Sequence, residues 1–305
     1  MNLMDLAENF STEEAAIRFL EAKLWPDGPV CPHCGVIGEA FEMHSKEDSK
    51  NQMRPGLWKC SECRKTFRVT VGTIFEDSHI PVHKWMMAIH LMCASKKGMS
   101  AHQLHRMLGV TYKSAWFMAH RIRHAMNDVG RQTKLQGTVE IDETYVGGKV
   151  KGKGVKAAKD AKTPVVAMVE RKGRVRSFDV PNVNLKELRP IIKEHLHGWS
   201  EVMTDDATIY PFLLKGHAAS HDVVCHSKDE YVRHEGGRSI HTNTIEGYFS
   251  IFKRGVIGTI HHISKQHLHR YLDEFDFRYN AREIPDDERA ELAIKRCQGK
   301  RLSYS

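Results

Sequence analysis

The chain has 305 residues, which is enough for two or three modules and at least one sizeable core. Its 46 Lys and Arg residues exceed its 38 Asp and Glu residues, and the formal net charge of +8 favours a polyanionic partner. No apolar run approaches the roughly 18 residues of a membrane helix, and the charged N-terminal stretch is unlike a signal peptide. We therefore expect a soluble, cytoplasmic protein without a membrane partner.

The first predicted helix runs from Phe10 to Leu24, and two C-x-x-C pairs follow it. Each pair makes a tight turn that aims two thiolates at one point, so two pairs complete a tetrahedral zinc shell. A strand-like stretch, Lys65–Val71, comes after the second pair, as a zinc ribbon requires. A redox dithiol is the alternative, but no thioredoxin-like βαβ pattern surrounds either pair. The sequence predicts that residues 1–75 hold one structural Zn²⁺ on Cys31, Cys34, Cys60 and Cys63.

Three helices are predicted in residues 76–132. Val82–Ala94 is an apolar helix, Ser100–Gln103 has the form of a capping box that opens a second helix, and Thr111 caps a third that runs to about Met126. The pattern is that of a helix-turn-helix, although a plain three-helix packing module would show the same spacing. If the module binds DNA, we expect contacts from Tyr112, Lys113, Ser114, Phe117, Arg121 and Arg123.

A segment rich in glycine and lysine lies between Gly147 and Thr163. Its composition is too polar to pack, which is typical of a surface loop. Lysines in such a loop can also contact DNA phosphates without reading the base sequence. The candidates for such contacts are Lys149, Lys151 and Lys153.

Residues 133–285 alternate between strand and helix patterns. In chain order we predict a strand carrying Asp142, a hairpin of Val165–Glu170 and Arg174–Val180, a helix Leu185–Leu196, a strand Glu201–Asp205, a helix Ala207–Leu214, a strand Ala219–Cys225 and a helix from His241. The order βββαβαβα in a mixed sheet is that of a ribonuclease-H-like α/β domain. The fold class is therefore α+β and multidomain, with residues 286–305 as a C-terminal tail.

In that topology the first strand is central and the fourth lies beside it, so Asp142 and Asp205 become neighbours. The last helix brings Glu246 across the sheet, and Lys253 follows two turns later on the same helix face. Three converging carboxylates repel one another, and two bound Mg²⁺ or Mn²⁺ ions make the arrangement tolerable. Such a site supports phosphoryl transfer on DNA by a two-metal mechanism, with Lys253 near the scissile phosphate.

Neighbouring polar residues receive other expected roles. Asn243 lies one turn before the helix glutamate and is a candidate ligand of metal-bound water or DNA, and Arg254 is a candidate phosphate contact. Glu143 points to the opposite face of its strand, whereas Glu140 lies on the catalytic face but nearer the strand's other end. Asp206 directly precedes a predicted helix and is expected to be its N-cap.

These motifs resemble the DDE transposases of bacterial insertion sequences in the ISXO-like group. The resemblance is carried by Trp25–Cys34, Val139–Lys149, Thr204–Tyr210, His241–Glu246 with Lys253, and Leu268–Arg282. It implies that Asp142, Asp205 and Glu246 hold the DDE roles and that Lys253 is the basic residue after the glutamate. Some members of the group use Asn at or near the third acidic position, so Asn243 remains an alternative to Glu246.

The resemblance implies a DNA transposase that binds terminal inverted repeats, cleaves at the element ends and joins the 3′-hydroxyls to target DNA. Family analogy further implies at least a homodimer on double-stranded DNA, associated with the nucleoid. A sequence-specific DNA-binding regulator with a non-catalytic C-terminal scaffold is the alternative, and the complete set of carboxylates argues against it. A nuclease without a joining step also remains open.

Overall fold

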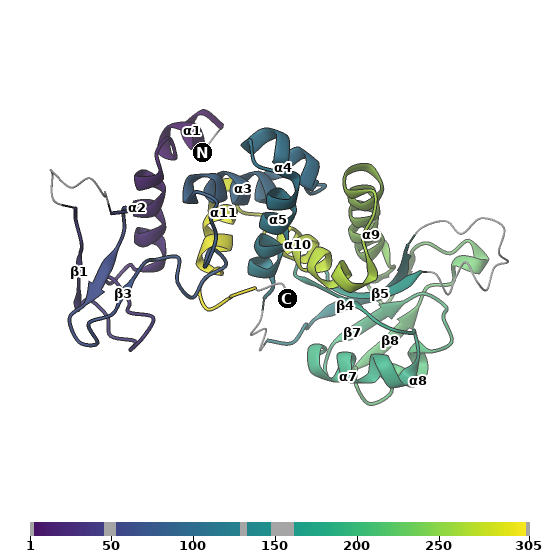
Figure 1. Ribbon diagram of the computed structural model, residues 1–305. Helices are drawn as coiled ribbons and strands as arrows, with labels where there is room; N and C mark the ends of the chain where they lie inside the picture. The colour runs from purple at the N-terminus through teal and green to yellow at the C-terminus, as the bar shows by residue number, and fades with distance from the viewer. Residues whose placement is uncertain (1–2, 46–52, 129–132, 148–161, 303–305) are drawn as a thin grey trace. The chain divides into compact units, whose positions relative to one another are not determined.

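The computed structural model describes residues 3–45, 53–128, 133–147 and 162–302 (Figure 1). The chain forms two compact units, and the proposed phosphate contacts Lys149, Lys151 and Lys153 lie outside the described residues. Unit 1 consists of Met1–Ser95, Met99–Met126 and Ile284–Ser305, and unit 2 consists of Lys96–Gly98 and Asn127–Glu283. Among the described residues, none of the helices combines the length and the apolar character that crossing a bilayer requires.

Unit 1 begins with two helices and a small antiparallel sheet of order β1-β2-β3. The elements are α1 (Leu3–Asn9), α2 (Glu13–Leu24), β1 (Ala40–Glu42), β2 (Trp58–Cys60) and β3 (Thr66–Phe67). The indole rings of Trp25 and Trp58 pack edge to face, 6.1 Å apart, beside the buried Phe67. The last strand is shorter than the predicted Lys65–Val71, because the N–H of Val71 turns back to the carbonyl of Arg68.

Three helices follow the ribbon in unit 1: α3 (Val82–Ala94), α4 (Ala101–Leu108) and α5 (Tyr112–Met126). The capping box at α4 is confirmed, since Ser100 and Gln103 exchange both side-chain-to-backbone hydrogen bonds. Gly109 closes α4 in the left-handed conformation at φ 58°, which a residue without Cβ adopts freely. The N–H of Ser114 donates to the hydroxyl of Thr111 at 3.1 Å, as predicted for the start of α5.

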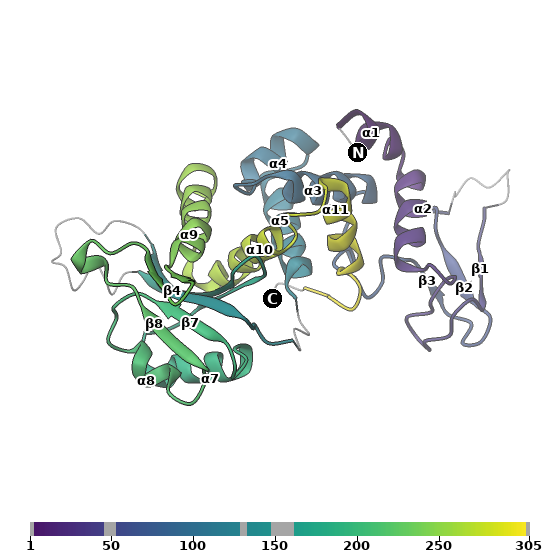
Figure 2. The ribbon, with the colours of Figure 1, turned by 180° about the vertical axis from the view of Figure 1, so that it is seen from behind.

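The prediction of a C-terminal tail at residues 286–305 is wrong. Asp286–Lys295 forms α11, which buries Ala290, Ala293 and Ile294 and packs against α3 and α2 within unit 1. Both ribbon views show α11 beside α3 (Figures 1 and 2). The helix has only ten residues, with few apolar positions and three acids in its first turn. Its sequence alone therefore resembles an exposed segment, and its apolar face becomes evident only from the packing against α3.

Unit 2 is built on a five-stranded mixed sheet of order β6-β5-β4-β7-β8. Its strands are β4 (Thr138–Val146), β5 (Thr163–Glu170), β6 (Val175–Asp179), β7 (Glu201–Thr204) and β8 (Ser220–Val223). The first three strands pair antiparallel, while β7 runs parallel to both β4 and β8. β5 is buried over nearly its whole length, which explains its unbroken apolar run.

Helices cover both faces of this sheet (Figures 1 and 2). One face packs on α7 (Leu185–His195) and α8 (Tyr210–Leu214), and the other on α9 (Asn243–Gly255) and α10 (Leu268–Asn280). The smaller elements are η1 (His226–Lys228), the hairpin β9 (Arg233–Glu235) and β10 (Arg238–Ile240), the π-helical turn η2 (Val256–Ile260) and η3 (Lys265–His267). β4 is therefore the central strand, between two apolar layers.

Candidate active site and zinc site

Asp142 lies near the middle of β4. On one side of β4, Asp142 is paired with Ala167 of β5. On the other side β4 pairs with the parallel strand β7, and the last residue pair in that register is Glu140 with Met203. Asp142 and Asp205 each lie two residues beyond that pair, so the parallel register brings both aspartates to one level of the sheet. A strand end thus supplies the second acid beside the first.

The carboxyl group of Asp142 is largely buried among other acids. Burial, followed by the charges of Asp205, Glu143 and Glu246, raises the pKa of Asp142 from its usual 3.8 to about 7. The N–H of Glu143 donates to Asp142 Oδ1 at 2.7 Å and opposes the shift. A divalent cation would relieve this repulsion, because carboxylate oxygens are hard ligands that Mg²⁺ prefers. The donor set therefore fits a divalent metal.

Glu140 holds the start of α9 onto β4, although the sequence assigned it no role. Its fully buried carboxylate accepts hydrogen bonds from the N–H groups of Thr244 at 2.8 Å and Ile245 at 3.0 Å, and from the Thr244 hydroxyl at 2.9 Å. Arg171 donates to the same carboxylate at 2.7 Å and to the carbonyl of His241 at 2.8 Å. A negative charge at a helix N-terminus is stabilising, so this network fixes the helix that carries Glu246.

Glu246 points from the first turn of α9 and is about half exposed. Its carboxylate accepts from the Thr242 hydroxyl at 3.0 Å and lies 3.4 Å from Nε2 of His226. No motif in the sequence pointed to His226, which comes from η1. Together with Asp142 and Lys253, Glu246 lines an open cavity of about 630 Å³. The cavity collects three cationic residues, Lys97, Lys253 and Arg254, and two of the three predicted acids; Asp205 is not among its lining residues.

The other predicted residues of α9 separate into two groups. Arg254 lines the same cavity, and its Nε donates to the carbonyl of Ser250 at 3.2 Å. Asn243 is exposed at the first position of the helix and does not line the cavity, and its backbone N–H donates to Nδ1 of His241 at 3.3 Å. Of the two candidates for the third position, Glu246 therefore lines the cavity and Asn243 does not.

Two acids next to the predicted site have other contacts. Glu143 also lines the cavity, and its carboxylate accepts a hydrogen bond from the hydroxyl of Tyr210 in α8 at 2.5 Å. The prediction that Asp206 caps a helix is wrong, because α8 begins only at Tyr210 and has no side-chain cap. Asp206 instead accepts from the hydroxyl of Ser227 at 2.9 Å, which lowers the pKa of Asp206.

The four predicted zinc ligands lie together in the ribbon. Their sulfur atoms all lie within 4.8 Å of one another, with Cys31 and Cys63 at 3.6 Å and Cys34 and Cys60 at 3.7 Å. Elsewhere in the described residues no other group of three or more candidate ligands meets that limit, so the three carboxylates of unit 2 are more widely spaced. Four clustered thiols fit a structural zinc ion, as predicted.

The two C-x-x-C turns have the same backbone design. The residue after each pair, Gly35 or Arg64, has a positive φ of 78° or 63° and donates its N–H to the carbonyl of the first cysteine. Burial alone would raise the pKa of Cys31, but hydrogen bonds from the His33 and Cys34 backbone and from neighbouring thiols lower it to about 6. A thiolate is the form that binds a metal. In the metal-free cluster the neighbouring Cys34 is shifted the other way: a backbone hydrogen bond lowers its pKa, but burial and the other three thiols outweigh that bond and raise the pKa to about 12.

On α5 the six predicted DNA contacts fall into exposed and buried sets. Tyr112 and Lys113 are exposed, Ser114 and Phe117 are half-buried, and Tyr112 stacks on His102 with ring centroids 4.4 Å apart. Arg121 and Arg123 are buried, which corrects the expectation that they face DNA. Their guanidinium groups donate instead to backbone carbonyls of unit 1, Arg121 to Ile74 and Glu76 and Arg123 to Met99. Their charge suggested a surface position, but both guanidinium groups are buried and donate hydrogen bonds to loop carbonyls.

Replacing Asp142 with Asn is expected to stabilise metal-free unit 2 at pH 8. Below pH 4 the wild-type carboxyl is protonated in both the folded and the unfolded protein, and its favourable contribution to the free energy of unfolding is fully present. Because the pKa in the folded protein is raised, this contribution is lost as the pH rises through about 7. The gain should be roughly 2–4 kcal/mol at pH 8 and should vanish near pH 4. This gain in stability is measured by denaturant-dependent hydrogen exchange of the β4 amides, after a chelator has removed divalent metal.

The control for this prediction is Asp206→Asn, which removes a neighbouring acid whose pKa is lowered. That substitution should give no gain at pH 8. Equal stabilisation by both substitutions would contradict the burial of Asp142 as the cause and point to a general effect of net charge.

Truncation of Glu140 to Ala is expected to destabilise unit 2 by about 3–5 kcal/mol, the cost of leaving a buried ionic partner unpaired. The loss should appear first as faster hydrogen exchange at the start of α9, where Thr244 and Ile245 lose their acceptor. Glu201→Ala, at a half-exposed glutamate of β7, is the matched control and should cost less than about 1 kcal/mol. Equal costs at both positions would show that Glu140 does not anchor the helix.

Comparison with known proteins gives two matches to family models. Residues 134–280 match the ISXO2-like transposase domain, and residues 11–66 match a transposase zinc-ribbon domain. The chain is also similar to a protein described as an uncharacterized protein in transposable element ISH50, from Halobacterium salinarum. That relative is 25% identical over an alignment of 302 positions, and the alignment covers 92% of this chain and 95% of the relative.

The two matched regions coincide with the two sites described above. The zinc-ribbon match contains all four clustered cysteines, and the transposase-domain match contains Asp142, Asp205, Glu246 and Lys253. The chain therefore carries an ISXO2-like transposase domain, preceded by a transposase zinc-ribbon domain.

Proposed function

We propose that the chain is a DNA transposase that binds the terminal inverted repeats of its insertion sequence, cleaves at the element ends and joins the 3′-hydroxyls to target DNA. The observation that supports this most is that Asp142, Glu246 and Lys253 line one cavity, while Asp205 follows the end of β7 at the level of Asp142 in the adjacent strand β4. The strand order supports a ribonuclease-H-like domain, which presents acids at this place in the sheet.

In this proposal Asp142, Asp205 and Glu246 hold two Mg²⁺ or Mn²⁺ ions. When bound, the ions supply Lewis-acid activation of the attacking oxygen and charge stabilisation at the leaving oxygen. The protein orients these ligands through β4, β7 and the anchored start of α9. Lys253 lies on the cavity wall, where its ammonium group neutralises charge on the phosphodiester and orients the strand.

DNA recognition is assigned to unit 1. We propose that α4 and α5 act as a helix-turn-helix, with Tyr112 and Lys113 as contacts and Ser114 and Phe117 beside them. The lysines of the glycine-rich segment, Asn243 and Arg254 are proposed to contact phosphates. The protein acts in the cytoplasm on nucleoid DNA, as at least a homodimer, because two element ends are processed together.

The test is strand cleavage and joining by the purified protein on a labelled DNA fragment that carries the element's ends. Products that require Mg²⁺ or Mn²⁺ and disappear with chelator are expected. Cleavage without joined products would favour a nuclease. Specific binding to the ends with no chemistry under any metal condition would favour a DNA-binding regulator.

A further inference from the structure

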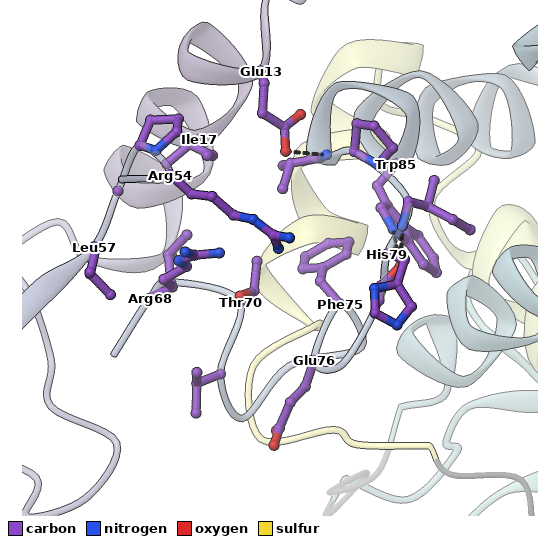
Figure 3. Close-up of a pocket in the computed structure, with 18 of the residues that line it drawn as sticks. Glu13, Ile17, Arg54, Leu57, Arg68, Thr70, Phe75, Glu76, His79 and Trp85 are labelled. Atoms are coloured by element: carbon purple, nitrogen blue, oxygen red, sulfur yellow. Dashed lines mark hydrogen bonds between the residues drawn. The ribbon is translucent and has the colours of Figure 1, made fainter. Parts of the chain in front are cut away.

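Unit 1 contains a cavity of about 800 Å³ between the ribbon and the start of α3 (Figure 3). Its size is within the range of about 300–1,000 Å³ that is typical of ligand sites. Ile17, Phe75 and Trp85 form part of an apolar wall (Figure 3). Arg54 precedes β2 and Arg68 follows β3, so both lie at the same end of this antiparallel pair and extend into the space. Gly56 allows this geometry: its φ is +70°, and a Cβ there would lie 2.5 Å from Ile17.

The carboxylates around the cavity are already engaged. Glu13 accepts from the N–H groups of Val82 at 2.8 Å and His83 at 3.1 Å, and so caps α3. Glu76 accepts from the N–H of Gly72 at 2.8 Å, and Arg301 pairs with Asp77 at 2.6 Å and with Glu76 at 3.3 Å. These acids have partners of their own.

The two arginines have no such partners. In the described part of the chain, neither guanidinium forms an ion pair or a hydrogen bond, although Arg68 is half-buried. Burial and then the charge of Arg54 lower the pKa of Arg68, and the charge of Glu13 does not compensate. Two neighbouring positive charges that form no ion pair are unfavourable in the free protein, and an anion bound between them would relieve the repulsion.

We propose that this cavity binds the phosphodiester backbone of DNA, with Arg54 and Arg68 as forked donors to phosphate oxygens. Three observations favour a nucleic acid over a small anion or an acidic protein segment. The cavity is larger than a phosphate ion needs, its wall is apolar enough to contact deoxyribose, and the chain has a net charge of +8. This inference rests on the proposed function in one respect: the polyanion that the cavity binds is taken to be DNA.

The experiment measures affinity for a short DNA duplex that lacks the element ends, without divalent metal, from 50 to 300 mM salt. Arg54→Ala and Arg68→Ala are each expected to weaken binding roughly tenfold at low salt and to reduce the slope of log affinity against log salt by about 1. Arg64→Gly is the matched control. It removes a ribbon arginine outside the cavity, and glycine suits its φ of 63°.

Thermal unfolding without DNA separates binding from folding. Because the two arginines repel each other, the Arg68→Ala protein should unfold at the same temperature as the wild type or at a higher one. If the Arg68→Ala protein does not fold, Arg54→Ala tests the proposal in its place, since Arg54 is exposed. Inorganic phosphate should raise the unfolding temperature of the wild type more than that of the double variant.

An unchanged salt slope in the double variant, or a loss no larger than that of Arg64→Gly, would overturn the proposal. Loss of self-association with unchanged DNA affinity would also overturn it and assign the cavity to an acidic protein segment. Because no cleavage is measured, failure of the transposase chemistry is a separate result. A protein that binds through this cavity but never cuts DNA would refute the proposed function and leave this inference intact.

Discussion

Asparagine in place of Asp142 is expected to reduce DNA strand cleavage by at least about 10³-fold while DNA affinity stays within about twofold of the wild type. The substitution keeps the shape of the side chain but removes the carboxylate of the central strand that we propose as a metal ligand. Asp205→Asn and Glu246→Gln should cause losses of the same order. Cleavage of the labelled element ends in Mg²⁺ measures the rates, and gel shift in the absence of metal measures the affinity.

The same series distinguishes Glu246 from Asn243. Glu246 lines the cavity with Asp142 and Lys253, whereas Asn243 is exposed at the helix start outside the lining. Asn243→Ala should therefore reduce cleavage by no more than about tenfold, in line with loss of one outer contact. If Asn243→Ala abolishes cleavage and Glu246→Gln leaves it intact, the third acidic role belongs near the start of the helix, and our assignment is wrong.

Removal of zinc is expected to unfold the ribbon while unit 2 keeps its structure. The ribbon has three strands of two or three residues and a small core around Phe67, and zinc binding contributes about 10–16 kcal/mol in isolated zinc-finger peptides. Cys60→Ser, or treatment with a strong chelator, should remove protection of β1–β3 amides from hydrogen exchange. Protection of β4 and β5 should not change.

Cys225→Ser is the matched control for the zinc experiment, because Cys225 is a half-buried cysteine of unit 2 outside the cluster. It should leave zinc content and ribbon protection unchanged. Ribbon amides that remain protected in a Cys60→Ser protein without zinc would show that packing of Trp25, Trp58 and Phe67 holds the ribbon by itself.

Local patterns allowed accurate prediction of several elements. The capping box at Ser100 and the apolar helix Val82–Ala94 depend on contacts within a few residues, and both are found where predicted. The cysteine pairs also specify their own turns, through Gly35 and Arg64. Where the determining interaction is local, sequence spacing is sufficient.

Elements whose role depends on distant partners could not be predicted in this way. Glu140 looks like one more acid on a strand, and its function is visible only when α9 brings Thr244 and Ile245 to it from far along the chain. Arg121 has the composition of a DNA contact, but loops earlier in the chain offer it buried carbonyls. The roles of these residues are determined by tertiary contacts and not by residue type or local sequence pattern.

The position of α11 in the chain has a consequence for synthesis on the ribosome. Unit 1 needs this helix to cover α3 and α2, yet Asp286–Lys295 is translated after the whole sheet of unit 2. The nascent chain therefore exposes an incomplete N-terminal unit until translation passes that helix, at about 5–20 residues per second. A transcript cut short before this point yields a chain with both cysteine pairs but without a closed core in unit 1.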